Sequence, residues 1–387
     1  MSTWLFCWEL GGGWGHVAPF RLPIERLLER GHQVMFAARD VASLPRLFRG
    51  LDVRWLQAPH SVATSVRRTN PARTYAEILH NVGWGDADEL AALVSAWRNL
   101  IDAVEPDALV LDQAPTALLA ARGMKLPTVL SGTGFASPPA VDPLPPLLPT
   151  TNAADGKNVE QRVLAHARLC CGPGLAPASL GELFQGADAT LLLSYAELDH
   201  YPSRREGRYF GVWDFGGAEI EPTWPAGERR VFGYWKSFPA EQDLIEGLAE
   251  RGLSSLIVHA DPPTMESHEQ VRFESRPVRL NRAARDATLA ISNGSFYTTA
   301  RCLQHGVPVL LIPLTVEQWL LSQRVVASGA GLIAPFDQPA ELLAKLDAML
   351  STSAFTEAAH RLAARWSPID EDAAVTRYVT ALQQVLK

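Results

Sequence analysis

Residues 4–38 read WLFCWELGGGWGHVAPFRLPIERLLERGHQVMFAA. Two apolar runs in this stretch, 4–8 and 34–38, have the length of buried strands. A glycine-rich turn follows the first run. In residues 17–30 the apolar side chains recur every three or four positions, as on one face of a helix, and Gly31 is placed to end that helix. The order strand, turn, helix, strand predicts the first unit of a parallel α/β sheet.

The same alternation continues along the chain and restarts after an irregular segment at 201–230 that is rich in Gly, Pro and Trp. A chain of 387 residues is longer than one hydrophobic core usually supports, so two domains are expected. The predicted organisation is an N-terminal Rossmann-like domain at 1–205, a linker at 206–229, a C-terminal Rossmann-like domain at 230–370 and a C-terminal helix at 371–387. Further strands are expected at 53–56, 108–111, 128–130, 190–193, 230–234, 256–259, 288–292 and 309–312, and further helices at 241–251 and 316–327.

Composition excludes several classes of protein. The formal charge of -7 and the pI near 5.8 provide no basic surface for a polyphosphate backbone, so nucleic-acid binding is not expected. The four cysteines have no metal-ligand spacing, which favours reduced thiols and a cytoplasmic location. No leader is expected at 1–9, which lacks a basic start. No membrane span is expected either, because two prolines interrupt the apolar run at 307–314.

The turn Glu9-Leu-Gly-Gly-Gly-Trp-Gly-His16 is typical of an anion-binding site. Glycines such as Gly13 and Gly15 let the backbone approach a ligand closely, and the N-terminus of a following helix favours negative charge. The spacing differs from the dinucleotide fingerprint G-x-G-x-x-G, since His16 stands where the third glycine would be. Asp40, just past the second strand, could bind a ribose or equally cap a helix. A simple dehydrogenase is therefore disfavoured.

These residues, together with Val17-Ala-Pro19 and Arg30-Gly-His-Gln-Val34, resemble the opening of nucleotide-sugar glycosyltransferases related to the UDP-glucuronosyl, plant secondary-metabolite and bacterial macrolide enzymes. The resemblance implies the GT-B architecture, in which two Rossmann-like domains have parallel sheets facing across a cleft. It also implies an inverting hexosyltransferase that uses a UDP or dTDP sugar as co-substrate and needs no metal or other cofactor. His16 occupies the position of the family's catalytic base, and a positioned imidazole suits the task of deprotonating an acceptor hydroxyl.

An imidazole base needs a carboxylate that orients it and stabilises its cation. Asp112 ends the strand-like run Ala108-Leu-Val-Leu-Asp112, and parallel strands end at one edge of a sheet. The family places its dyad aspartate in this context, so the resemblance implies a pair formed by His16 and Asp112. The alternative is a structural role for each residue, with Asp112 as a helix N-cap and His16 bonded to nearby backbone.

The second half of the chain carries a block similar to the family's donor-binding signature: Ser292-Asn-Gly-Ser-Phe-Tyr-Thr-Thr299, Gly306-Val-Pro308, Leu310-Leu-Ile-Pro313 and Glu317-Gln318. The resemblance implies that Gly294, Ser295 and Thr298 hold the donor diphosphate, and that Glu317 and Gln318 contact sugar hydroxyls. For the last two residues, a capped helix start is the alternative. Where the family has His-Gly-Gly-x-Gly-Thr, this chain has Asn293 in place of the histidine and Tyr297 in place of a glycine. The side chain of Asn293 still offers an amide as a hydrogen-bond donor.

The expected partners are a nucleotide-sugar donor and a small-molecule, glycan or lipid acceptor bound by the first domain. Thr133 and Phe135, in the loop after the strand at 128–130, are candidate acceptor contacts, because loops on a rigid scaffold commonly carry specificity. Asp86-Ala-Asp88 and Asp370-Glu-Asp372 resemble a metal-nucleotide D-x-D motif but are interpreted as helix caps, so no metal site is expected. Two other functions stay open: a nucleotide-sugar 2-epimerase and a non-catalytic nucleotide-sugar-binding protein.

Overall fold

The computed structural model describes residues 1–62, 66–148, 153–171, 174–215, 219–262, 269–366 and 370–386. The chain divides into two compact units: unit 1 comprises Met1–Phe215 together with Glu371–Lys387, and unit 2 comprises Gly216–Asp370. The chain therefore leaves unit 1 after residue 215 and returns to it at residue 371. The predicted linker at 206–229 includes residues 216–218, which lie outside the described part of the chain.

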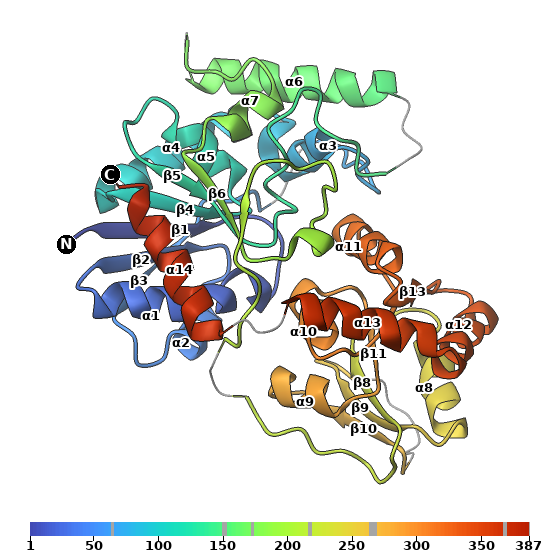
Figure 1. Ribbon diagram of the computed structural model, residues 1–387. Helices are drawn as coiled ribbons and strands as arrows, with labels where there is room; N and C mark the ends of the chain where they lie inside the picture. Colours follow the sequence, from blue (N-terminus) through green and yellow to red (C-terminus); the bar gives the residue numbers. More distant parts are fainter. Residues whose placement is uncertain are drawn as a thin grey trace. The chain divides into compact units, whose positions relative to one another are not determined.

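Unit 1 is built on a parallel sheet of seven strands (Figure 1). The strands are β1 (Thr3–Trp8), β2 (Gln33–Ala38), β3 (Val53–Gln57), β4 (Ala108–Asp112), β5 (Thr128–Leu130), β6 (Ala189–Leu192) and β7 (Arg208–Tyr209). Their order is β3-β2-β1-β4-β5-β6-β7, so the direction in which strands are added reverses between β1 and β4. In that central pair Trp8 lies beside Asp112, and β4 is buried along its whole length because helices cover both faces of the sheet.

Helices cover the two faces of this sheet. They are α1 (Arg21–Glu29), α2 (Leu44–Leu47), α3 (Tyr75–Leu79), α4 (Ala87–Val104), α5 (Pro115–Ala121), α6 (Ala153–Cys171), α7 (Leu180–Gln185) and α14 (Glu371–Gln384). Leu5 of β1 faces a core shared with α4 and α5, while the neighbouring Phe6 faces the other side and packs against Phe20 and Phe36. The C-terminal helix α14 packs against α1 (Figure 1).

The predicted helix at 17–30 exists, but the residue at which it was expected to begin is wrong. The structure has two short 3-10 turns, η1 (Trp14–His16) and η2 (Ala18–Phe20), and α1 begins only at Arg21. A helix that began at residue 17 would place Pro23 in its interior, where the missing N–H and the ring disrupt the hydrogen-bonded ladder. Starting at Arg21 places Pro23 in the first turn, where no intrahelical N–H bond is required.

Unit 2 repeats the architecture with a parallel sheet of six strands. The strands are β8 (Arg230–Tyr234), β9 (Ser254–Val258), β10 (Val271–Glu274), β11 (Leu289–Ser292), β12 (Val309–Leu311) and β13 (Gly331–Ile333), in the order β10-β9-β8-β11-β12-β13. The helices are α8 (Glu241–Glu250), α9 (Leu280–Asp286), α10 (Phe296–Gln304), α11 (Val316–Ala327), α12 (Pro339–Ser351) and α13 (Ser353–Trp366). Helix α8 packs against α12, and α9 and α13 both pack against α10 (Figure 1).

The two parallel sheets confirm the predicted α/β fold class, and the predicted strands lie within two residues of the observed ones. Strands β7, β10 and β13 were not predicted, because each has two to four residues and no fully buried apolar run. No helix in the described ranges is long and apolar enough to span a bilayer.

Candidate active site

Each sheet has a point at which its strand order reverses, and ligands of such folds bind beyond the carboxyl ends of the strands at that point. In unit 1 the two strands concerned are β1 and β4. The glycine loop, Gly11 to Gly15, follows β1, and Asp112 is the last residue of β4. The predicted base, its predicted partner and the predicted anion loop therefore lie at one edge of one sheet.

The structure brings His16 and Asp112 into direct contact. The Nδ1 atom of His16, which ends η1, lies 3.0 Å from Oδ2 of Asp112, and both side chains are buried. Burial raises the pKa of Asp112, and the neighbouring His16 opposes that rise. An ionised Asp112 accepts a hydrogen bond from the Nδ1–H group of His16. The other ring nitrogen, Nε2, then carries the free lone pair. This is the tautomer that a general base requires.

Trp8, the last residue of β1, holds the imidazole from one face. Its ring is nearly parallel to that of His16, with the centroids 5.3 Å apart. The indole Nε1 donates to the Leu10 carbonyl at 2.5 Å, which fixes the tryptophan in turn. An aromatic face at this distance also favours the imidazolium that forms when His16 takes a proton.

Two glycines make room for the pair. A Cβ built on Gly132 would lie 2.2 Å from Asp112 Oδ1, and a Cβ built on Gly11 would lie 2.7 Å from His16 Nε2. Both glycines have positive φ, 87° and 78° respectively, so other residues would also be strained there. The loop Gly11 to Gly15 is otherwise open: Gly13 and Gly15 are exposed, and a Cβ on Gly13 would meet nothing within 4 Å.

The predicted acceptor contacts Thr133 and Phe135 are each only 8% exposed. The ring of Phe135 packs edge-on against His200, with the centroids 5.5 Å apart. The predicted acceptor loop, Ser131 to Phe135, called the acceptor loop below, therefore presents little side-chain surface of these two residues.

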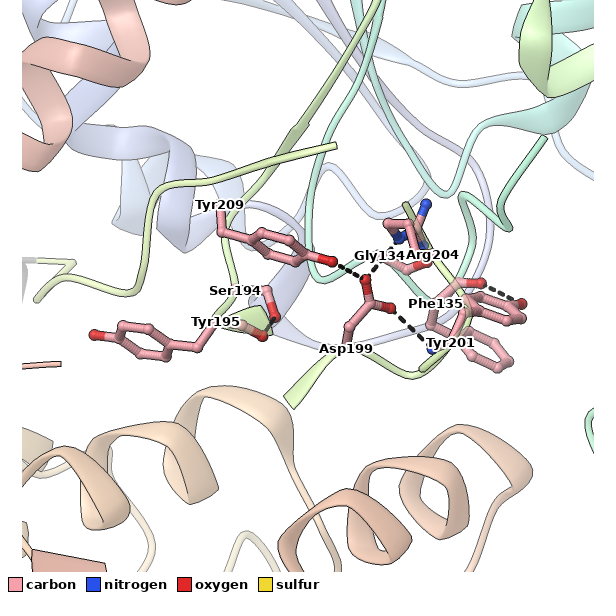
Figure 2. A network of polar contacts seen from close by, with 8 residues as sticks. All are labelled: Gly134, Phe135, Ser194, Tyr195, Asp199, Tyr201, Arg204 and Tyr209. Carbon is pink, nitrogen blue, oxygen red and sulfur yellow. Dashed lines mark hydrogen bonds and ion pairs between the residues drawn. The ribbon is translucent and has the colours of Figure 1, made fainter. Parts of the chain in front are cut away.

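A buried polar network fixes the acceptor loop (Figure 2). Asp199 accepts hydrogen bonds from Arg204 Nε at 2.6 Å, the Tyr209 hydroxyl at 2.5 Å and the Tyr201 backbone N–H at 2.8 Å. Arg204 also donates to the Gly134 carbonyl at 3.0 Å, and the Tyr201 hydroxyl donates to the Phe135 carbonyl at 2.8 Å. The loop next to Asp112 is thus held by its backbone, which suits a site that needs fixed geometry.

In unit 2 the strand order reverses between β8 and β11, and the donor-like block follows β11. Gly294 has φ 81°, and a Cβ there would lie 3.1 Å from the Gln318 carbonyl and 3.1 Å from Ser322 Oγ. This glycine lets the loop pack directly on the start of α11. Ser295 is the N-cap of α10 but makes no capping hydrogen bond with its side chain, and Thr298 lies buried in the first turn.

Asn293 connects two backbone segments of unit 2 through its side chain. Its side chain is buried, Oδ1 accepts from the Lys236 N–H at 2.6 Å, and Nδ2 donates to the Ile312 carbonyl at 2.9 Å. The amide therefore ties the loop after β8 to the end of β12. These two bonds use Oδ1 and one of the two hydrogens of Nδ2, so the predicted phosphate contact of Asn293 stays a prediction.

Gln318 and Glu317 lie in the first turn of α11. Gln318 Oε1 accepts from the N–H groups of Leu314 at 2.8 Å and Thr315 at 3.2 Å, which completes a capping box. The structural alternative is therefore realised for Gln318, although the same amide keeps its NH₂ group as a donor. Glu317 is partly exposed beside it.

The remaining candidate acids serve as caps. Asp40 Oδ1 accepts from the Ala42 N–H at 2.9 Å, and Asp86 Oδ1 accepts from the Glu89 N–H at 2.9 Å as N-cap of α4. Asp372 lies in the first turn of α14 and pairs with Arg26. Within the described ranges, no three His, Cys, Asp or Glu side chains come together as a metal-binding group would require.

No model of a known protein family matches the chain. A Mycobacterium tuberculosis protein described as a PGL/p-HBAD biosynthesis glycosyltransferase is 25% identical over 314 residues, which are 72% of this chain and 71% of that protein. The solved structure of the kitacinnamycin glycosyltransferase matches with a TM-score of 0.71 at 16% identity, over 100% of this chain and 98% of that one. The spinosyn rhamnosyltransferase SpnG, complexed with thymidine diphosphate, matches with a TM-score of 0.68 at 17% identity over 100% of both chains.

The chain has the GT-B glycosyltransferase fold. The sequence relative and the structural neighbours are all glycosyltransferases, in agreement with the resemblance seen in the sequence. In this GT-B chain, the glycine loop and the His16–Asp112 pair belong to unit 1, and the donor-like loop belongs to unit 2.

Two residues that lie beside His16 were not predicted as candidates from the sequence. Trp8 was noted only as part of an apolar strand, and Gln113 was passed over because it follows Asp112 in a stretch without a motif. Gln113 has a positive φ of 48° and is 5% exposed. Its carbonyl accepts from the Leu10 N–H at 3.0 Å, which joins the ends of β1 and β4. No sequence signal distinguishes a left-handed glutamine from an ordinary one.

Proposed function

We propose that the protein is an inverting, metal-independent glycosyltransferase that moves a hexose from a UDP or dTDP sugar to a hydroxyl group of an acceptor. One observation carries the proposal: His16 Nδ1 is bonded to Asp112 Oδ2 at 3.0 Å, at the strand-order reversal of unit 1. A buried imidazole held by a carboxylate at one nitrogen is arranged to take a proton at the other.

In the proposed reaction the acceptor O–H gives its proton to His16 Nε2 while the oxygen attacks the anomeric carbon of the donor. The bond from that carbon to the phosphate oxygen breaks, and its electron pair leaves with the nucleotide diphosphate. A single displacement inverts the configuration. The imidazolium that forms is stabilised by the charge of Asp112 and by the face of Trp8.

We assign the donor to unit 2 because its 292–318 block resembles the family's donor-binding signature. SpnG was solved with thymidine diphosphate, which supports a nucleoside diphosphate as the leaving group. Gly294 and Ser295 lead into α10, whose first N–H groups lack intrahelical partners and suit a phosphate. We assign the phosphate contacts to Gly294, Ser295 and Thr298, with the second N–H of the Asn293 amide as a further donor.

Unit 1 is the proposed acceptor half, since it contains the proposed base His16. The complex of SpnG with the spinosyn aglycone supports an acceptor molecule as the second ligand. The acceptor of this chain is proposed only as a molecule with a reactive hydroxyl. The four free cysteines are compatible with a reducing compartment, so the cytoplasm is part of the proposal.

The test measures donor turnover and transfer by mass spectrometry, with UDP-glucose and dTDP-glucose and a panel of phenols and secondary alcohols. His16→Ala should lower transfer by roughly 10²- to 10⁴-fold and leave the thermal stabilisation by UDP or dTDP intact. Replacement of the exposed His360 on α13 by Ala is the matched control and should leave transfer unchanged.

Three results would contradict the proposal in different ways. Equal transfer by the wild type and His16→Ala would show that His16 is not the catalytic base. Conversion of the donor sugar to its epimer without an acceptor would favour the epimerase. Stabilisation by the sugar nucleotides with no turnover of any kind would favour the non-catalytic binder.

A further inference from the structure

Gln113 is a buried residue whose polar end lacks a protein partner. Its side chain is 5% exposed, and its Nε2 atom has no hydrogen-bond partner among the described residues. A buried amide without a partner destabilises a folded protein, so its position calls for a physical reason.

The backbone at Gln113 is also strained. Its φ of 48° lies in the left-handed region, which only one other non-glycine residue of the described chain adopts, the exposed Glu105 at the end of α4. Glu105 ends a helix, where this conformation is common. Gln113 instead directly follows Asp112 at the end of a buried strand, and strain of this kind is found preferentially at functional sites.

The carboxamide lies beside the proposed base. A single point next to Gly11, the position of a Cβ built there, is 2.7 Å from both Gln113 Oε1 and His16 Nε2. The two atoms are therefore no more than two hydrogen-bond lengths apart, a separation that one hydroxyl oxygen can bridge. Rotation of the carboxamide by half a turn exchanges its oxygen and nitrogen with almost no change of shape, so either a donor or an acceptor can face that oxygen.

We propose that Gln113 binds the acceptor hydroxyl at the base: its N–H donates to the acceptor oxygen while the acceptor O–H donates to His16 Nε2. This inference rests on the proposed glycosyltransferase function and adds a third residue to its acceptor site. The proton of the acceptor hydroxyl moves to His16 while one lone pair of its oxygen attacks the anomeric carbon. A second lone pair of the same oxygen keeps accepting the hydrogen bond from the Gln113 N–H. The amide thereby fixes the direction of attack and gains a partner only when acceptor is bound.

Gln113→Met separates this role from a structural one. Methionine has a similar length and no hydrogen-bonding group, so removal of an unpartnered buried amide should leave the thermal midpoint equal to or above that of the wild type. With the best acceptor from a panel of phenols and secondary alcohols, kcat/KM for the acceptor should fall roughly 10-fold, because one hydrogen bond to the substrate is lost. The KM for UDP-glucose or dTDP-glucose should stay within about twofold.

A second variant and a control complete the experiment. Gln113→Asn keeps an amide and suits a left-handed backbone, but is one methylene too short, so it should be as stable as the wild type and still impaired toward the acceptor. Glu105→Met, at the other left-handed position, should leave the kinetics unchanged.

A lower thermal midpoint for Gln113→Met would show that the amide already has a structural partner and would overturn the inference. Unchanged acceptor kinetics in both Gln113 variants would overturn it as well. These results are distinct from a failure of the proposed function, which would be seen in the wild type as transfer to no acceptor; in that case the role of Gln113 falls with it.

Discussion

Replacing Gly132 by alanine tests whether the pair His16–Asp112 depends on the space beside it. The new Cβ would lie 2.2 Å from Asp112 Oδ1 and 2.7 Å from its Cγ, whereas ordinary contacts begin at 3.4 Å. The carboxylate must therefore retreat by about 1 Å, which is enough to lose its hydrogen bond to His16. We expect a loss of about 1 to 2 kcal/mol from the left-handed backbone and about 1.5 to 3 kcal/mol from the broken bond to a charged group. Turnover should fall by roughly 10²-fold.

Gly50→Ala provides the matched control for this substitution. Gly50 has φ 83°, close to the 87° of Gly132, but a Cβ there would meet nothing within 4 Å. In urea unfolding, Gly50→Ala should lower the free energy of unfolding by the backbone cost alone, and Gly132→Ala should lower it further. Glucose transfer should fall only in Gly132→Ala. If the two variants were equally stable and equally active, the space beside Asp112 would not be what holds the pair.

Three further results are expected. Burial raises the pKa of Glu9 to about 7, so the unfolding free energy of the wild type relative to Glu9→Gln should fall by roughly 3 kcal/mol as pH rises from 4.5 to 7; a flat difference would refute this. Gln318→Glu keeps an oxygen that caps α11, loses the NH₂ donor and adds a negative charge near Gly294, so it should weaken binding of UDP-glucose more than that of UDP; equal loss for both ligands in calorimetry would refute the sugar contact. Arg204→Ala leaves the buried Asp199 charge unpaired and should cost about 3 to 5 kcal/mol in urea unfolding, against at most about 1 kcal/mol for Arg251→Ala at a more exposed ion pair; similar costs would argue against the loop network.

The fold could be predicted because its strands are buried on both faces. Runs such as 108–111 and 128–130 are short, apolar and bounded by polar residues, so their positions follow from the sequence. The contact between His16 and Asp112 could be predicted for a related reason. Each follows or ends a strand of one parallel sheet, and the ends of parallel strands meet at one edge.

The details that the sequence did not reveal depend on backbone geometry and on distant partners. The sequence did not reveal that the amide of Asn293 binds backbone just beyond the ends of β8 and β12. The left-handed conformation of Gln113 depends on how β4 leaves the sheet, since glutamine has no intrinsic preference for it. The late start of α1 was visible in principle in Pro23, which excludes a helix that begins four or more residues earlier.

The route of the chain through its two units has a consequence for how such enzymes can be recombined. The backbone N–H of Asp214 donates to Glu371 Oε2 at 2.8 Å, so the points at which the chain leaves and re-enters unit 1 are neighbours. A flexible bridge of about four residues would suffice to close unit 1. Unit 2 is thus one contiguous cassette, and a single exchange of residues 216–370 for the matching segment of another GT-B enzyme would replace the proposed donor half. The proposed acceptor half, with α14 still packed on α1, would remain intact.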